Sequence, residues 1–127
     1  MRLLDFYQGK KILITGHTGF KGTWLSKILI DAGAFVSGYA LPPSDNPCFF
    51  DLANITNGMY SVLGDIRDID RISTLIEEFE PEIVIHMAAQ AIVRDGYRDP
   101  VYTYGTNVMG TVNILDAIRK TNCVRSF

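Results

Sequence analysis

Apolar residues along the chain fall into short continuous runs that alternate with stretches of helical spacing. Four runs have the length and β-branched content of strands: KILIT (11–15), FVSGYAL (35–41), MYSVLGD (59–65) and EIVIHMAA (82–89). Between them, apolar residues recur every three or four positions in 23–34 and 68–80, which predicts two amphipathic helices. Strands separated by helices pair in parallel through crossovers. The pattern therefore predicts an α/β fold with a doubly wound parallel sheet, its strands buried on both faces.

The remaining segments have weaker patterns. Residues 48–60 read as a long loop with one helical turn around FFDLAN, and QAIVRDGYRDP (90–100) reads as a polar loop. A long helix is expected to open after Pro100 and to run to residue 122. CVRSF (123–127) has the character of the beginning of a fifth strand.

The stretch GHTGFKGT, from Gly16 to Thr23, resembles two phosphate-binding loops. A Walker loop needs lysine directly after the last glycine, whereas here Lys21 precedes Gly22. Gly16, Gly19 and Gly22 form G-x-x-G-x-x-G between a buried strand and an amphipathic helix, where backbone amides can meet a pyrophosphate. This context predicts a dinucleotide loop and a Rossmann-like fold, with a merely tight strand-helix turn as the alternative.

Side chains at the other strand ends refine this hypothesis. The second strand ends in GYALPP with neither an acidic residue for a ribose nor a cation for a 2′-phosphate, which favours NAD over NADP. Asp65, at the end of the third strand, is a candidate for the amine of adenine, or else it caps the following helix, as Asp68 also could. His17 and His86 lack metal-ligand spacing. His17 reads first as packed or solvent-facing, with a catalytic base as the alternative, and His86 reads as a core histidine. Asn107 has low helix propensity, which indicates a hydrogen-bonding side chain.

Composition and charge exclude several classes of protein. With 127 residues and 47% hydrophobic residues the chain fits one folded unit, and a net charge of −2 gives no general attraction to nucleic acid or anionic membranes. No apolar segment has the length of a membrane span or a signal sequence. Cys48 and Cys123 stand apart without a metal-like companion, so we expect unpaired thiols in a reducing cytoplasm and no metal site.

Taken together, these segments resemble the extended short-chain dehydrogenase/reductase family, also called the NAD-dependent epimerase/dehydratase family. Within it they look like the N-terminal part of the CDP-glucose 4,6-dehydratases. The matching stretches are GKKILITGHTGFKGTWL, GYALPP, GDIRD, IVIHMAAQ, Val93-Arg94 and TYGTNVMGTVNILDA. The resemblance implies a lyase that uses NAD to convert CDP-glucose to CDP-4-keto-6-deoxyglucose, a reaction of bacterial polysaccharide biosynthesis.

The resemblance also implies roles for particular residues. The pyrophosphate would be lined by Gly16, Gly19, Phe20, Lys21 and Gly22. Asp65 and Ile66 would contact the adenine. A shelf that faces the ribose would be formed by Met87, Ala88 and Ala89. Thr106 would contact the cofactor, Asn107 would support the active site, and Gln90 and Arg94 would face the substrate. The long helix would pair in a homodimer.

In this family the catalytic serine or threonine and the tyrosine-lysine pair follow the fifth strand, at whose beginning Phe127 stands. We therefore expect residues 1–127 to form the N-terminal part of a dinucleotide-binding Rossmann domain, truncated after the start of the fifth strand and inactive alone. An unpaired sheet edge would favour self-association. The alternatives are a non-catalytic dinucleotide-binding module and another nucleotide-sugar epimerase or dehydratase.

Overall fold

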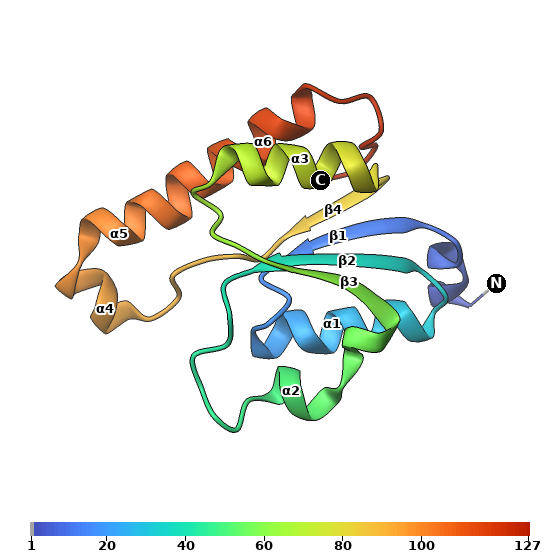
Figure 1. Cartoon of the computed structure of the whole chain (residues 1–127), viewed down its shortest axis with the longest axis horizontal. Coiled ribbons are helices and arrows are strands. Elements are labelled where there is room, and N and C mark those ends of the chain that lie inside the picture. The colour runs from blue at the N-terminus through green and yellow to red at the C-terminus, as the bar shows by residue number, and fades with distance from the viewer. Residues whose placement is uncertain (1) are drawn as a thin grey trace.

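The computed structural model describes residues 2–127. Figure 1 shows the elements in chain order. They are η1 (Leu3–Tyr7), β1 (Lys11–Thr15), α1 (Phe20–Asp31), β2 (Phe35–Ala40), α2 (Phe49–Ala53), η2 (Ile55–Gly58), β3 (Met59–Leu63), α3 (Ile69–Phe79), β4 (Ile83–His86), α4 (Val93–Arg98), α5 (Pro100–Tyr104), η3 (Gly105–Met109) and α6 (Gly110–Arg119). The elements η1 and η2 are 3-10 helices, whereas η3 is a π-helix.

The four strands form one parallel sheet in the order β3-β2-β1-β4. From β1 the chain first builds outward through β2 and β3, then returns to place β4 on the other side of β1. Thr15, the last residue of β1, lies opposite Tyr39 of β2 and His86 of β4. The doubly wound parallel sheet predicted from the sequence is confirmed, and its strand order reverses at β1.

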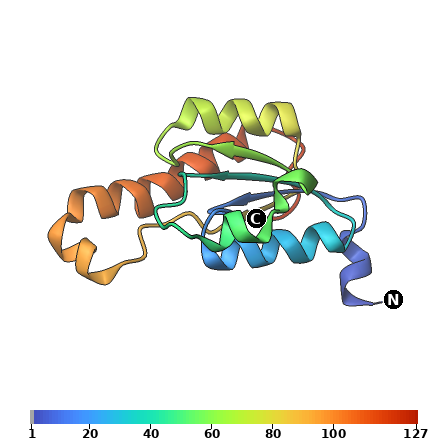
Figure 2. The same ribbon diagram turned by 60° about the horizontal axis from the view of Figure 1, so that its bottom comes forward.

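Helices cover both faces of the sheet, with α1 and α2 on one side and α3 and α6 on the other (Figures 1 and 2). Successive residues of a strand point to opposite faces, so β1 contributes to two cores. Ile12 and Ile14 pack with Leu29 of α1, whereas Leu13 packs with residues of α3 and α6 such as Ile76 and Ile114. This double burial explains the continuous apolar run in β1.

The strand β4 departs from the expectation of burial on both faces. Val84 is buried, but Ile83 and Ile85 are only half-buried. On the far side of β4, the part of the chain that the structure describes forms a single parallel bridge, between Ile83 and Ser126. Of the fifth strand expected at residues 123–127, the structure thus forms only this one bridge. A hollow of about 700 Å³ lies beside this edge.

Residues 90–100 are not the polar loop that the sequence predicts, because α4 occupies most of them. Neither α4 nor α5 buries a residue, so no apolar periodicity marks these helices. Pro100 is the first residue of α5, and Asp99 caps it by accepting a hydrogen bond from the Tyr102 N–H at 3.0 Å. The long helix predicted after Pro100 is present, but the π-turn η3 widens it between α5 and α6.

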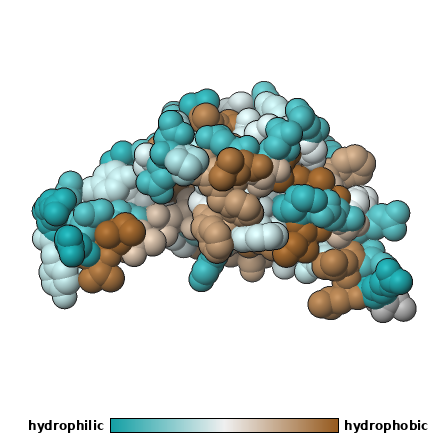
Figure 3. Space-filling model, turned by 90° about the horizontal axis from the view of Figure 1, so that it is seen from below, coloured by the Kyte–Doolittle hydropathy of each residue, from teal (hydrophilic) through white to brown (hydrophobic). Residues whose placement is uncertain are grey.

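Hydrophobic side chains also reach the surface on the side of α1 and α2, where Figure 3 shows them interspersed with polar groups. The ring of Phe49 lies 5.5 Å from that of Phe20 and 5.0 Å from that of Trp24, measured between centroids. Within residues 2–127, no helix has both the length and the apolar character needed to cross a bilayer.

Candidate functional site

A pocket of about 320 Å³ opens at the C-terminal ends of the strands, where the strand order reverses. This is the place at which open α/β sheets bind ligands. Ten residues that the sequence nominated line the pocket: Gly16, Gly19, Lys21, Gly22, Asp65, Ile66, Met87, Ala88, Ala89 and Thr106. They come from four separate segments of the chain, and the fold brings them together.

The glycine loop forms one wall of this pocket. Gly16 has a φ of +82°, and its N–H donates to the Tyr39 carbonyl at 2.9 Å. Gly22 lies against the backbone of Gly16, so that a Cβ at position 22 would come within 2.9 Å of the Cα of His17. The helix α1 begins at Phe20 with Gly19 as its N-cap and no capping side chain. Its first N–H groups therefore have no intrahelical acceptor and suit an anion.

His17 points away from the pocket into the sheet. It is fully buried, its Nε2 lies 2.7 Å from Ser61 Oγ, and its ring fills the space that a side chain at Gly38 would need. Burial lowers the pKa of His17 to about 4. Phe50 contacts the same ring edge-on, with centroids 5.4 Å apart. His17 thus fixes the glycine loop to β2 and β3, as a packed rather than a catalytic histidine.

His86 is likewise a packed histidine. Its Nδ1 lies 2.7 Å from Thr15 Oγ1 and its Nε2 lies 3.2 Å from Thr111 Oγ1, and burial lowers its pKa. Thr15 Oγ1 also accepts hydrogen bonds from the N–H groups of Met87 at 3.0 Å and Ala88 at 3.1 Å. These bonds place the backbone of the shelf that Met87 and Ala88 form in the pocket.

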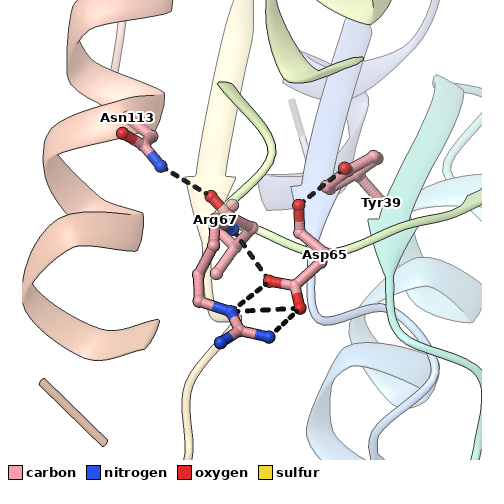
Figure 4. A network of polar contacts seen from close by, with 5 residues as sticks. Tyr39, Asp65, Arg67 and Asn113 are labelled. Atoms are coloured by element: carbon pink, nitrogen blue, oxygen red, sulfur yellow. Dashed lines mark hydrogen bonds and ion pairs between the residues drawn. The ribbon is translucent and has the colours of Figure 1, made fainter. Parts of the chain in front are cut away.

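The segment after β3 is held from several sides (Figure 4). The Tyr39 hydroxyl donates to the Asp65 carbonyl at 2.7 Å, and Asn113 Nδ2 donates to the Ile66 carbonyl at 3.1 Å. The Arg67 guanidinium pairs with the Asp65 carboxylate and lowers the pKa of that carboxyl. Of the two carboxylates considered as helix caps, Asp68 caps α3, by accepting from the Arg71 N–H at 3.1 Å. Asp65 lines the pocket, and its carboxylate is held by Arg67.

Thr106 contributes a buried hydroxyl to the pocket. The residue is 6% exposed, and its Oγ1 finds no hydrogen-bond partner among residues 2–127. A buried hydroxyl without a partner is unfavourable in the free protein, by about 1–3 kcal/mol. A polar group of a ligand in the pocket would satisfy it.

Four nominated residues lie outside the pocket. Phe20 turns its ring outward onto Phe49, and Arg94 is exposed on α4. Asn107 Oδ1 accepts from the Gln90 N–H at 2.7 Å, and Asn107 Nδ2 donates to the Gln90 carbonyl at 3.0 Å. The hydrogen-bonding side chain expected at Asn107 is confirmed, and its partner is the segment that follows the shelf.

Several residues that the sequence did not nominate also line the pocket. They are Thr18, Tyr39, Ala40, Leu41, Gly64, Ala91 and Tyr102. Leu41 and Gly64 directly follow β2 and β3, so their place at strand ends was a usable signal, and Tyr102 is an aromatic residue of a type that can stack on a base or sugar. In the described part of the chain, no cluster of three His, Cys, Asp or Glu side chains is arranged to hold a metal ion.

Residues 13–127 match the family described as GDP-mannose 4,6 dehydratase. The chain is 48% identical over 122 residues to CDP-glucose 4,6-dehydratase of Salmonella typhimurium, an alignment that covers 96% of this chain and 34% of that protein. The chain thus spans about a third of the length of this relative.

Solved structures show the same fold. The epimerase Mth375 from Methanothermobacter thermautotrophicus matches with a TM-score of 0.84 and 26% identity, over 95% of this chain and 34% of that one. The UDP-glucose 4-epimerase of Brucella ovis, solved in complex with NAD, matches with a TM-score of 0.75 and 32% identity, over 93% of this chain and 35% of that one.

Proposed function

Because the chain belongs to the GDP-mannose 4,6 dehydratase family, we propose that it is the NAD-binding part of a nucleotide-sugar 4,6-dehydratase, a lyase. The observation that carries this proposal is the pocket at the strand ends, with its glycine loop and the unpaired hydroxyl of Thr106. The NAD complex of the Brucella ovis epimerase, whose fold this chain shares, supports the choice of cofactor.

The residues present fit a dinucleotide. The N–H groups at the start of α1 and the glycine loop would hold the pyrophosphate, with Lys21 at the mouth of the pocket. The shelf of Met87, Ala88 and Ala89 carries short or flexible side chains, which let a ribose lie close to the backbone. When bound, NAD would accept a hydride from the sugar and return it. The residues of this chain would bind and orient the dinucleotide. Asn107 holds the Gln90 segment beside the site.

We propose CDP-glucose as the sugar nucleotide, supported by the 48% identity to the Salmonella typhimurium enzyme. The product would be a 4-keto-6-deoxy sugar nucleotide for polysaccharide biosynthesis. A cytoplasmic location fits the two free cysteines, Cys48 and Cys123. A homodimer through α5 and α6 is supported by the exposed side chains Val101, Tyr104, Val108, Val112 and Leu115 on these helices and the turn between them.

Titration calorimetry of the chain with NAD, NADP and CDP-glucose tests the cofactor. We expect binding of NAD and weaker binding of NADP, because the pocket residues at the end of β2, Ala40 and Leu41, supply no cation for a 2′-phosphate. Absence of NAD binding by a folded chain would refute the proposal. Activity is tested on the protein in its full natural length with CDP-glucose and NAD, by the loss of one water from the sugar nucleotide in a mass spectrum. Interconversion of UDP-sugars instead would assign an epimerase.

A further inference from the structure

Arg67 connects the two walls at one end of the pocket. Its Nη2 donates to Asp65 Oδ2 at 2.7 Å and its Nε donates to Asp65 Oδ1 at 3.0 Å (Figure 4). On its other side, the guanidinium carbon lies 4.8 Å from the centroid of the Tyr102 ring. Asp65 and Tyr102 line the pocket, whereas Arg67 stands behind them. The segment after β3 and the helix α5 are therefore joined through Arg67.

Three N–H groups of Arg67 hold both oxygens of the Asp65 carboxylate. The backbone N–H donates to Oδ1 at 2.9 Å and Nη2 donates to Oδ2 at 2.7 Å. The Nε N–H is shared between the two oxygens, at 3.0 Å from Oδ1 and 3.1 Å from Oδ2. The backbone on either side is fixed as well, by Tyr39 on the Asp65 carbonyl and by Asn113 on the Ile66 carbonyl. Asp65 thus presents a fixed, acceptor-only group to the pocket.

A carboxylate held in this way distinguishes bases by the exocyclic group that they present to it. An exocyclic amine donates a hydrogen bond to a carboxylate, whereas a carbonyl oxygen at the same place repels it. Without the guanidinium, the Asp65 side chain would gain rotational freedom and solvation, and discrimination would weaken. By fixing the Asp65 carboxylate, Arg67 therefore influences which base the pocket binds.

We propose that Arg67 is a positioning residue that makes the pocket selective for an amino-bearing purine, by holding the Asp65 carboxylate in place and bridging it to Tyr102. This inference rests on the proposed function, because it assumes that the pocket receives the base of a dinucleotide. Arg67 acts through Asp65, and contacts with the ligand belong to Asp65 and Tyr102.

The test compares NAD with nicotinamide hypoxanthine dinucleotide, in which a carbonyl oxygen replaces the amine of adenine. Calorimetry on the full chain measures the ratio of the two dissociation constants. We expect the unsubstituted chain to prefer NAD by roughly tenfold or more, as for a hydrogen bond to a charged group. Arg67→Met should bring the ratio close to one, and Arg67→Lys, which keeps the charge but lacks the planar fork, should lie between them.

Arg71→Met is the matched control, since Arg71 is an exposed arginine of α3 whose side chain does not line the pocket. It should keep the full preference for NAD. Circular dichroism and unfolding midpoints identify variants that fold, and the ratio is read only from these. A folded Arg67→Met that retains the original ratio, with Arg67→Lys unchanged too, would overturn the inference.

The outcomes for the unsubstituted chain separate the two proposals. Equal binding of both dinucleotides would overturn the base-selective role of Asp65 and Arg67 while leaving NAD binding intact. Binding of neither dinucleotide would overturn the proposed function, and this inference with it.

Discussion

Asn107 and Gln90 are joined by two hydrogen bonds of opposite direction. The side-chain oxygen of Asn107 accepts from the Gln90 N–H, and its side-chain nitrogen donates to the Gln90 carbonyl. The amide of Asn107 thus pairs with the backbone of Gln90 as a neighbouring strand would. Because Asn107 lies in the π-turn, the widened part of the helix is tied directly to the segment that follows the shelf.

Removal of this pair should destabilise the fold. Asn107→Ala leaves the N–H and carbonyl of Gln90 without partners, which we expect to lower the free energy of unfolding by about 1–3 kcal/mol. Urea unfolding followed by the fluorescence of Trp24, the single tryptophan, measures it. Asn122→Ala, at an exposed asparagine, is the control and should stay within about 0.5 kcal/mol. Equal stability of the two variants would contradict the structural role of Asn107.

Thr106 and Thr111 should respond in opposite ways to loss of the hydroxyl. Thr106→Val removes a buried group that has no partner among the described residues, so stability should be unchanged or higher while NAD binding weakens several-fold. Thr111→Val removes a hydroxyl that donates to the Asn107 carbonyl and lies 3.2 Å from His86 Nε2. This substitution should lower the free energy of unfolding by about 1 kcal/mol. Thermal unfolding and calorimetry with NAD check both. A destabilised Thr106→Val would show that its hydroxyl is already satisfied.

The glycine loop should not tolerate even a methyl group at position 22. In Gly22→Ala the new Cβ would collide with the backbone of Gly16 and His17, so the loop must shift and NAD affinity should fall at least about tenfold. Gly96→Ala is a matched change, because the nearest atom to its new Cβ is 3.7 Å away. Calorimetry should find its NAD affinity unchanged. Unaltered binding by Gly22→Ala would exclude the loop from the site.

His17 should make stability depend on pH. Its pKa is about 4 in the folded chain and 6.5 as an ordinary histidine, so below pH 6.5 the unfolded chain takes up a proton that the folded chain does not. The contribution of His17 to the free energy of unfolding should therefore fall from pH 6.5 to pH 4, by up to about 3 kcal/mol, and level off below.

His86, whose pKa is also lowered, acts in the same direction. Urea unfolding at a series of pH values gives the combined slope, and His17→Gln should remove the larger part of it. A His17→Gln variant with the original slope would mean that His17 is protonated without penalty in the folded chain.

The parts of the fold with strong side-chain patterns could be predicted from the sequence. The strand β1 and the helix α3 follow from local spacing, since each buries one or two regular faces, and the glycine loop follows from the spacing of its three glycines. The helix α4 could not, because it buries no residue and therefore has no periodic apolar face. The π-turn is a change in backbone hydrogen bonding, to which the choice of side chains gave no clue except the low helix propensity of Asn107.

The site was predictable at strand ends and unpredictable where distant residues meet. Asp65 follows a strand and was nominated, but the contact of Arg67 with Tyr102 joins positions that share no local pattern. Ser61, the partner of His17, lies 44 residues away in the sequence. Such contacts arise only once the sheet has brought the segments together, so they have no local signature.

The strand order also sets when the pocket can exist during synthesis. The strand β1, which carries the glycine loop, lies between β2 and β4, and Thr15 and His86 are 71 residues apart in the chain. When only the first half of the chain has emerged from the ribosome, the glycine loop is therefore present without the end of β4, where Met87 and Ala88 lie against Gly16. Contacts over so long a separation form slowly. The nascent chain thus acquires a complete pocket only after β4, α5 and Thr106 of η3 have emerged, and a dinucleotide can stabilise the fold only from that moment on.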